Sequence, residues 1–185
     1  NGYTSVAEIG GGSLVGYWAF NGSYIDSVSN TAGTNKGTGF TTGFKGQALQ
    51  GAMNGYVLNA PSNAIKNMQS FTVTEWVNTP PPSSGIIDIF TLSNTTQFWG
   101  NIEIFFENGS DNTNGKLRVH VFKNGTDNTY AVDNIPNLFN AWVNLTVTYD
   151  ATTSTFAVYA SGSKVSSGTL SGVSGALSFA SVGNI

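Results

Sequence analysis

Short runs of alternating apolar and polar residues recur along the chain, and small polar residues separate them. Period-two alternation of Val, Ile, Thr and aromatic residues, bounded by Gly, Asn, Ser and Asp, is typical of half-buried β-strands. The pattern predicts strands at 13–20, 46–51, 55–59, 70–78, 86–93, 98–107, 115–122, 128–133, 141–149, 154–161, 163–170 and 176–183. One short helix is expected over 62–68, where Ser62 can cap the first turn.

The hairpin at 141–163 indicates which face of a sheet is buried. In its first strand Val143, Leu145, Val147 and Tyr149 share one face, and mainly polar residues occupy the other. The apolar set is therefore predicted to be a core face. Many short antiparallel strands with little helix form a two-sheet sandwich or a barrel, and the sandwich is favoured for a chain of this length.

Composition narrows the classes of function. The chain has 185 residues, 9% of them charged, a net charge of −3 and no cysteine. This excludes disulfide scaffolds and thiolate metal sites, and the scattered cations argue against a nucleic-acid partner. No apolar run reaches the length of a membrane-spanning helix. Residues 1–12 are expected to be an arm or the end of a linker, and 13–185 one domain.

Four segments resemble a known family. They are LVGYWAFNGSYIDSVSN, FKGQALQGAMNGYVLNAP, SFTVTEWVN and AWVNLTVTYDATTSTFAVYASGS, in the order in which the family carries its motifs. The chain thus resembles laminin-G-like (LamG type 3) domains of the concanavalin A-like lectin/glucanase superfamily. The resemblance implies an all-β, two-sheet antiparallel jelly-roll sandwich. It also implies a secreted or cell-surface location, with the bacterial outer-membrane surface as one setting.

One departure from the family concerns the last strand. The family closes with a strand similar to G-IDEvriY, whereas this sequence ends in SVGNI. A sheet that lacks one strand leaves unpaired backbone groups along its edge. We expect sequence beyond Ile185, the arm 1–12 or a strand from a partner chain to fill that place. The domain is then expected to belong to a larger surface assembly.

Glycoside hydrolysis is the enzymatic alternative, because some relatives carry acids at alternate positions of one strand. The segment NIEIFFEN offers Glu103 and Glu107, but Phe105 stands where the family's middle Asp would be. Four residues of strand separate the two acids by about 13 Å. Glycosidase carboxyls lie roughly 5–5.5 or 6.5–9.5 Å apart. The sequence therefore predicts no catalysis, and the two acids are interpreted as surface carboxylates.

The resemblance also implies a calcium site. Asp26 and Asn30, in YIDSVSN, match the family's "DssGn" segment, and calcium takes six to eight oxygen ligands. The alternative is that Asp26 caps a turn through its own backbone.

Carbohydrate binding is predicted from exposed aromatic and polar side chains. Alternation places Trp99, Asn101, Glu103 and Phe105 on one face of the run 98–107, and it places Arg118, His120 and Phe122 on one face of 115–122. If these runs pair, their side chains form a patch suited to a sugar. The alternative is that the aromatic rings belong to the core, as expected for Trp18, Trp76 and Trp142.

The sequence thus predicts a non-catalytic extracellular or cell-surface module that binds a glycan or a surface protein. The alternative from another class is a structural or adhesion subunit with protein partners and no glycan ligand. A glycoside hydrolase is the third reading.

Overall fold

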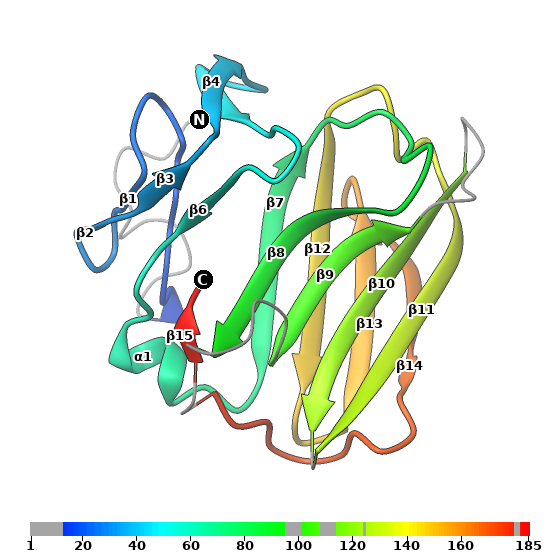
Figure 1. Ribbon diagram of the computed structural model, residues 1–185. Coiled ribbons are helices and arrows are strands. Elements are labelled where there is room, and N and C mark those ends of the chain that lie inside the picture. Colours follow the sequence, from blue (N-terminus) through cyan, green and yellow to red (C-terminus); the bar gives the residue numbers. More distant parts are fainter. Residues whose placement is uncertain (1–12, 95–100, 108–113, 124, 180–181) are drawn as a thin grey trace. The chain divides into compact units, whose positions relative to one another are not determined.

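The computed structural model describes residues 13–94, 101–107, 114–123, 125–179 and 182–185 (Figure 1). The predicted arm 1–12 lies outside the described residues. The chain divides into two compact units, one formed by 1–67 with 183–185 and the other by 68–182. Each unit is described here by itself.

The larger unit contains two antiparallel sheets (Figure 1). The first has the order β14-β13-β12-β7, with β7 at Phe71–Val77, β12 at Val143–Asp150, β13 at Thr155–Ala160 and β14 at Ser163–Thr169. The second has the order β11-β10-β9-β8, with β8 at Ile86–Asn94, β9 at Ile102–Glu107, β10 at Asn114–Lys123 and β11 at Thr126–Pro136. Strand β15 (Val182–Asn184) begins at the last residue of this unit.

The core of this unit lies between the two sheets. Val143, Leu145, Val147 and Tyr149 are all buried, which confirms the core face predicted for the hairpin. From the other sheet, β9 and β10 contribute these buried side chains: Ile102, Ile104, Phe106, Leu117, Val119 and Val121. Tyr130 of β11 stacks on Phe156 of β13 with ring centroids 5.2 Å apart. The two sheets therefore pack face to face, as in a β-sandwich.

Two bulges shape the second sheet. In β8 the pairing with β9 shifts between Asp88 and Phe90, so that Asp88 is opposite Phe105 and Phe90 is opposite Ile104. Asp88 therefore faces away from the core although Phe90 faces toward it. In β10 the pairing with β11 shifts between Gly115 and Leu117. A Cβ atom on Gly115 would lie 2.1 Å from Cδ2 of Leu138, so only glycine fits there.

The smaller unit is built from short pairs of strands. β1 (Ile25–Asp26) pairs with β2 (Thr31–Ala32), β3 (Thr34–Lys36) with β6 (Tyr56–Leu58), and β4 (Gly39–Thr42) with β5 (Gln47–Gln50). Helix α1 (Asn63–Lys66) follows, and the Ser62 hydroxyl accepts a hydrogen bond from the Ile65 N–H. This confirms the predicted helix and its cap. Ile185 and Asn59 exchange two backbone hydrogen bonds, both 3.0 Å long.

Some predicted strands are wrong. Residues 13–20 contribute only an isolated bridge between Trp18 and Asp26, and 176–179 contain no strand. Alternation does not predict strands β1 to β4, because each is only two to four residues long. The pairs β1–β2, β3–β6 and β4–β5 were therefore not predicted in full. Trp76 was expected in the core, but it is 46% exposed, because alternation on β7 places it with Thr72 and Thr74 on the outer face. In the described part of the chain, no helix has the length and apolarity of a membrane span.

Candidate functional site

The face of β8–β11 that points away from the core gathers most of the polar candidates. β9 and β10 pair as the sequence predicted, and Glu103 lies opposite His120 and Phe105 opposite Arg118. We call this surface the polar face and define it by Asp88, Asn101, Glu103, Phe105, Glu107, Arg118, His120 and Phe122. Trp99, which was expected beside these residues, lies outside the described residues.

Glu103 is at the centre of the polar face and is only 9% exposed. Its Oε2 atom lies 3.4 Å from Nδ1 of His120, and its carboxyl group shares a hydrogen bond with that of Asp88. The β8 bulge is what places Asp88 on this face. The Glu103 carboxyl group on β9 thus contacts side chains of both neighbouring strands, Asp88 on β8 and His120 on β10.

Burial and neighbouring acids shift the protonation of this carboxyl pair. Removal from water, the charge and hydrogen bond of Asp88, and the charge of Asp127 together raise the pKa of Glu103 to about 7. Loss of water around its own carboxyl group raises the pKa of Asp88, and the hydrogen bond with Glu103 opposes that shift. Within the pair, the hydrogen bond favours the protonated form of Glu103 and the ionised form of Asp88, so Glu103 donates and Asp88 accepts.

Arg118 organises the other end of the polar face. Its Nη2 atom lies 2.6 Å from Oε2 of Glu107 and 2.9 Å from Oδ1 of Asp133, and its Nη1 donates to the Leu117 carbonyl. Phe105 lies across from Arg118 and is only 5% exposed. Its ring meets the His120 ring edge-on at 4.9 Å. The side chains in this part of the face therefore hold one another in place.

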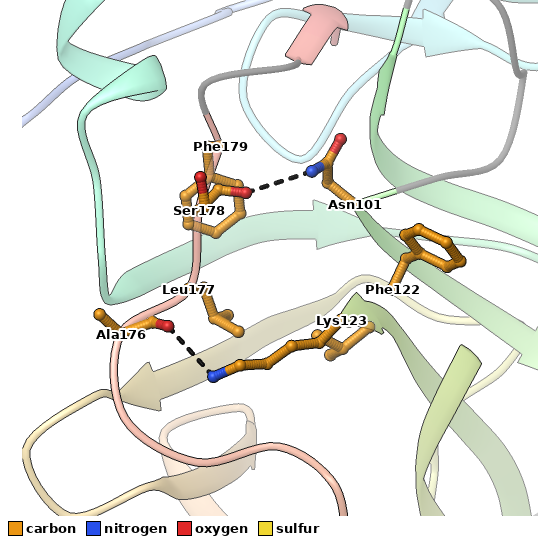
Figure 2. Close-up of a pocket in the computed structure, with 8 residues that line it drawn as sticks. Asn101, Phe122, Lys123, Ala176, Leu177, Ser178 and Phe179 are labelled. Carbon is orange, nitrogen blue, oxygen red and sulfur yellow. Dashed lines mark hydrogen bonds between the residues drawn. The ribbon is translucent and has the colours of Figure 1, made fainter. Parts of the chain in front are cut away.

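A hollow of about 230 Å³ lies beside Asn101 and the end of β10 (Figure 2). Phe122, which is 42% exposed, lines it on one side, and residues 176–179 run along the other. The Asn101 amide donates to the Ser178 carbonyl at 3.2 Å. Lys123 donates to the Ala176 carbonyl at 3.1 Å and also to the Ser174 carbonyl. Asn101 lies two residues before Glu103, and Phe122 lies two residues after its cross-strand partner His120, so the hollow continues the polar face.

The family to which the chain belongs follows from its similarity to known protein families. A laminin-G-type family model, described as the concanavalin A-like lectin/glucanases superfamily, matches residues 50–184. The chain belongs to this superfamily. A search of curated proteins finds no match. Membership and the antiparallel two-sheet architecture confirm the expected fold, and laminin-G-like domains are binding modules in general.

Some concanavalin A-like proteins are hydrolases, so the carboxyl groups of this laminin-G-like domain need comparison with glycosidase geometry. Asp88 and Glu103 share a hydrogen bond, which sets their oxygens roughly 2.5–3.0 Å apart. Retaining enzymes separate their carboxyls by roughly 5–5.5 Å and inverting enzymes by more. Glu107, the second acid of the strand, is paired with Arg118 instead. The absence of catalysis stays a prediction.

The residues expected to bind calcium lie in the smaller unit. The buried Asp26 carboxylate accepts hydrogen bonds from the Tyr17, Val28 and Ser29 N–H groups and from the Ser29 hydroxyl. Burial alone would raise the pKa of Asp26, but these hydrogen bonds together lower it. Asn30 is exposed and adopts a positive φ of 56°. Asp26 therefore caps the turn, and calcium binding by these two residues stays a prediction.

Sequence reasoning missed Asp88, Asp133 and Lys123 as parts of the site. Asp88 is the one charged residue in the run IIDIFTLS, which is a signal of a polar face. The bulge that follows it cannot be read from alternation. Asp133 and Lys123 reach the site through contacts with Arg118 and with residues 174–176, and such contacts appear only in the folded chain.

Proposed function

We propose that this domain is a non-catalytic carbohydrate-binding module of an extracellular or cell-surface protein. A sugar chain lies along the polar face, and one ring enters the hollow beside Phe122. The observation that carries the proposal is the continuity of that hollow with paired polar side chains on β9 and β10. Membership of a lectin-like superfamily supports it.

The chemistry of the face suits a sugar. An exposed aromatic ring offers a flat apolar surface to the C–H face of a sugar ring. Phe122 supplies such a ring at the rim of the hollow. The Glu103–Asp88 pair and the His120 imidazole offer both donors and acceptors to sugar hydroxyls. Because these groups project from a sheet and brace one another, they lose little freedom on binding.

A glycan array with the purified domain tests the proposal, run once with calcium and once with chelator. Calcium-dependent binding would support a metal contribution from Asp26 and Asn30. We expect Phe122→Ala and His120→Ala to weaken binding at least tenfold, because truncation of central contacts commonly costs more than about 1 kcal/mol. Trp76→Ala is the matched control, since Trp76 is similarly exposed on the other sheet. Silence of the wild-type domain in both conditions would refute the proposal.

The outer face of β7 and β12 supports the second candidate function, a structural or adhesion subunit. Thr74 and Thr146 are hydrogen bonded there at 2.8 Å, and Trp76 lies opposite Asn144 of β12. A flat, uncharged surface with an exposed indole ring suits a protein partner. Loss of partner binding in Trp76→Ala, together with unchanged behaviour of Phe122→Ala, would favour this function.

A further inference from the structure

Carboxyl groups outnumber basic groups around the polar face. Asp88, Glu103 and Glu107 project from it, and Asp127 and Asp133 come from the neighbouring strand β11, where Asp127 is opposite Phe122. The basic side chains described here are Lys116, Arg118 and Lys123, together with His120. Even with Glu103 protonated, four carboxylates remain beside one Arg and two Lys side chains, so a ligand that follows this face meets an excess of negative charge.

The basic side chains are also engaged within the protein. Arg118 is held between Glu107 and Asp133, at 2.6 and 2.9 Å. Lys123 donates to the carbonyls of Ser174 and Ala176, and Lys116 has an interaction partner of its own. His120 lies against the Glu103 carboxyl group. The positive charge of Arg118 is therefore already offset by two carboxylates, and an acidic ligand would bring a third.

We infer that the polar face selects uncharged glycans and rejects acidic ones. The inference rests on the proposed carbohydrate binding and names the ligand class of the same site. Charge-assisted hydrogen bonds from a cationic donor are the strong contacts that an anionic sugar can make. An acidic sugar on this face would lose that donor and would meet like charges at short range, which disfavours a partner strongly. A neutral sugar needs only the exposed ring and the donor–acceptor groups.

Glu107 and Asp133 are then specificity-determining residues, because they neutralise Arg118. Their removal would leave the guanidinium group free to take an acidic ligand. Glu107→Gln and Asp133→Asn keep the side-chain shape and remove the charge. Asp133→Asn alone is the milder change, since the Asp133 side chain is 53% exposed.

The test is an array of paired oligosaccharides in which each neutral chain has a counterpart that differs only by a carboxylate or a sulfate. We expect the wild-type domain to bind its neutral chains at least tenfold more tightly than their acidic counterparts. In Asp133→Asn and in the Glu107→Gln/Asp133→Asn double variant, that ratio should fall stepwise toward one. Asp150→Asn is the control for loss of one charge, because Asp150 is the exposed last residue of β12, on the other sheet.

The outcomes separate this inference from the proposed function. If the wild-type domain binds acidic chains as tightly as neutral ones, charge selection is wrong and carbohydrate binding stands. If it binds neither class, the proposed function fails first and the inference falls with it. If the ratio of neutral to acidic binding is unchanged in the folded Asp133→Asn and double variants, neutralisation of Arg118 by Glu107 and Asp133 does not set the preference, and the inference is overturned.

Discussion

Glu103 and His120 are direct cross-strand partners, and Oε2 of Glu103 lies 3.4 Å from Nδ1 of His120. The same carboxyl group shares a hydrogen bond with Asp88 on the other side. The Glu103 carboxyl group therefore has a polar partner on each adjacent strand, and its raised pKa should make the polar face depend on pH.

The first prediction is a loss of stability as pH rises. The pKa of Glu103 is raised from 4.5 to about 7, so the folded chain binds more protons than the unfolded chain between these values. Its contribution is complete below about pH 4.5, and the free energy of unfolding falls as pH rises to about 7. Urea unfolding from pH 4 to 8 should show that the free energy of unfolding falls less steeply in Glu103→Gln than in the wild type. An identical slope in both proteins would contradict this assignment.

Glu75 gives a second prediction, for which the pH range extends further upward. It lies on the inner face of β7, in the row of Phe71 and Val77, and removal from water raises its pKa from 4.5 to about 8. The folded chain therefore binds more protons than the unfolded chain between about pH 4.5 and 8, and the free energy of unfolding falls across that range. Glu75→Gln should therefore gain stability relative to the wild type at pH 9 but not at pH 4. Thermal melts at the two pH values measure this difference, and an equal effect at both would argue against a desolvated carboxyl.

The core face gives a third prediction. Leu145 is almost completely buried, and truncation of such a residue leaves a cavity. We expect Leu145→Ala to lower the free energy of unfolding by about 2–5 kcal/mol. Thr146→Ala, the neighbouring position on the outer face, should cost less than about 1 kcal/mol. Similar costs for both variants in denaturant melts would mean that the two faces are reversed.

Gly115 gives the fourth prediction. A Cβ atom there would overlap the Leu138 side chain, with 2.1 Å between it and Cδ2. Gly115→Ala should destabilise the domain by about 1–3 kcal/mol, because the buried leucine has to move. Gly51→Ala is the control, since a Cβ atom at Gly51 has no neighbour within 4 Å. A Gly115→Ala protein with an unchanged melting temperature would show that Leu138 yields without cost.

The central strands could be predicted because the side-chain period of a strand is two. The alternation of Val143, Leu145 and Val147 fixed their common face before any contact was known, and they are buried. The same rule placed Glu103 and His120 on polar faces and left only the pairing of their strands to be established. Local alternation therefore predicted much of the β-sandwich and part of the candidate site.

The remaining features depend on contacts that a local pattern does not contain. Trp76 was expected in or near the core because it lies within a strand motif of the family, although its position on β7 decided its exposure. Arg118 is held by Glu107 from β9 and by Asp133 from β11, so its ion pairs required the order of three strands. The β1 to β4 strands are too short to show any period.

The bulge in β8 divides that strand into two phases. Before Ile89, even-numbered Asp88 faces outward; after it, even-numbered Phe90 faces inward. Without this register shift, Asp88 and Phe90 would share one face, so the strand would have to bury Asp88 or expose Phe90. Deletion of Ile89 alone would keep both orientations while straightening the strand. Because a bulge bends the strand that carries it, the local bend of β8 depends on Ile89, whereas the carboxyl group on the polar face comes from Asp88.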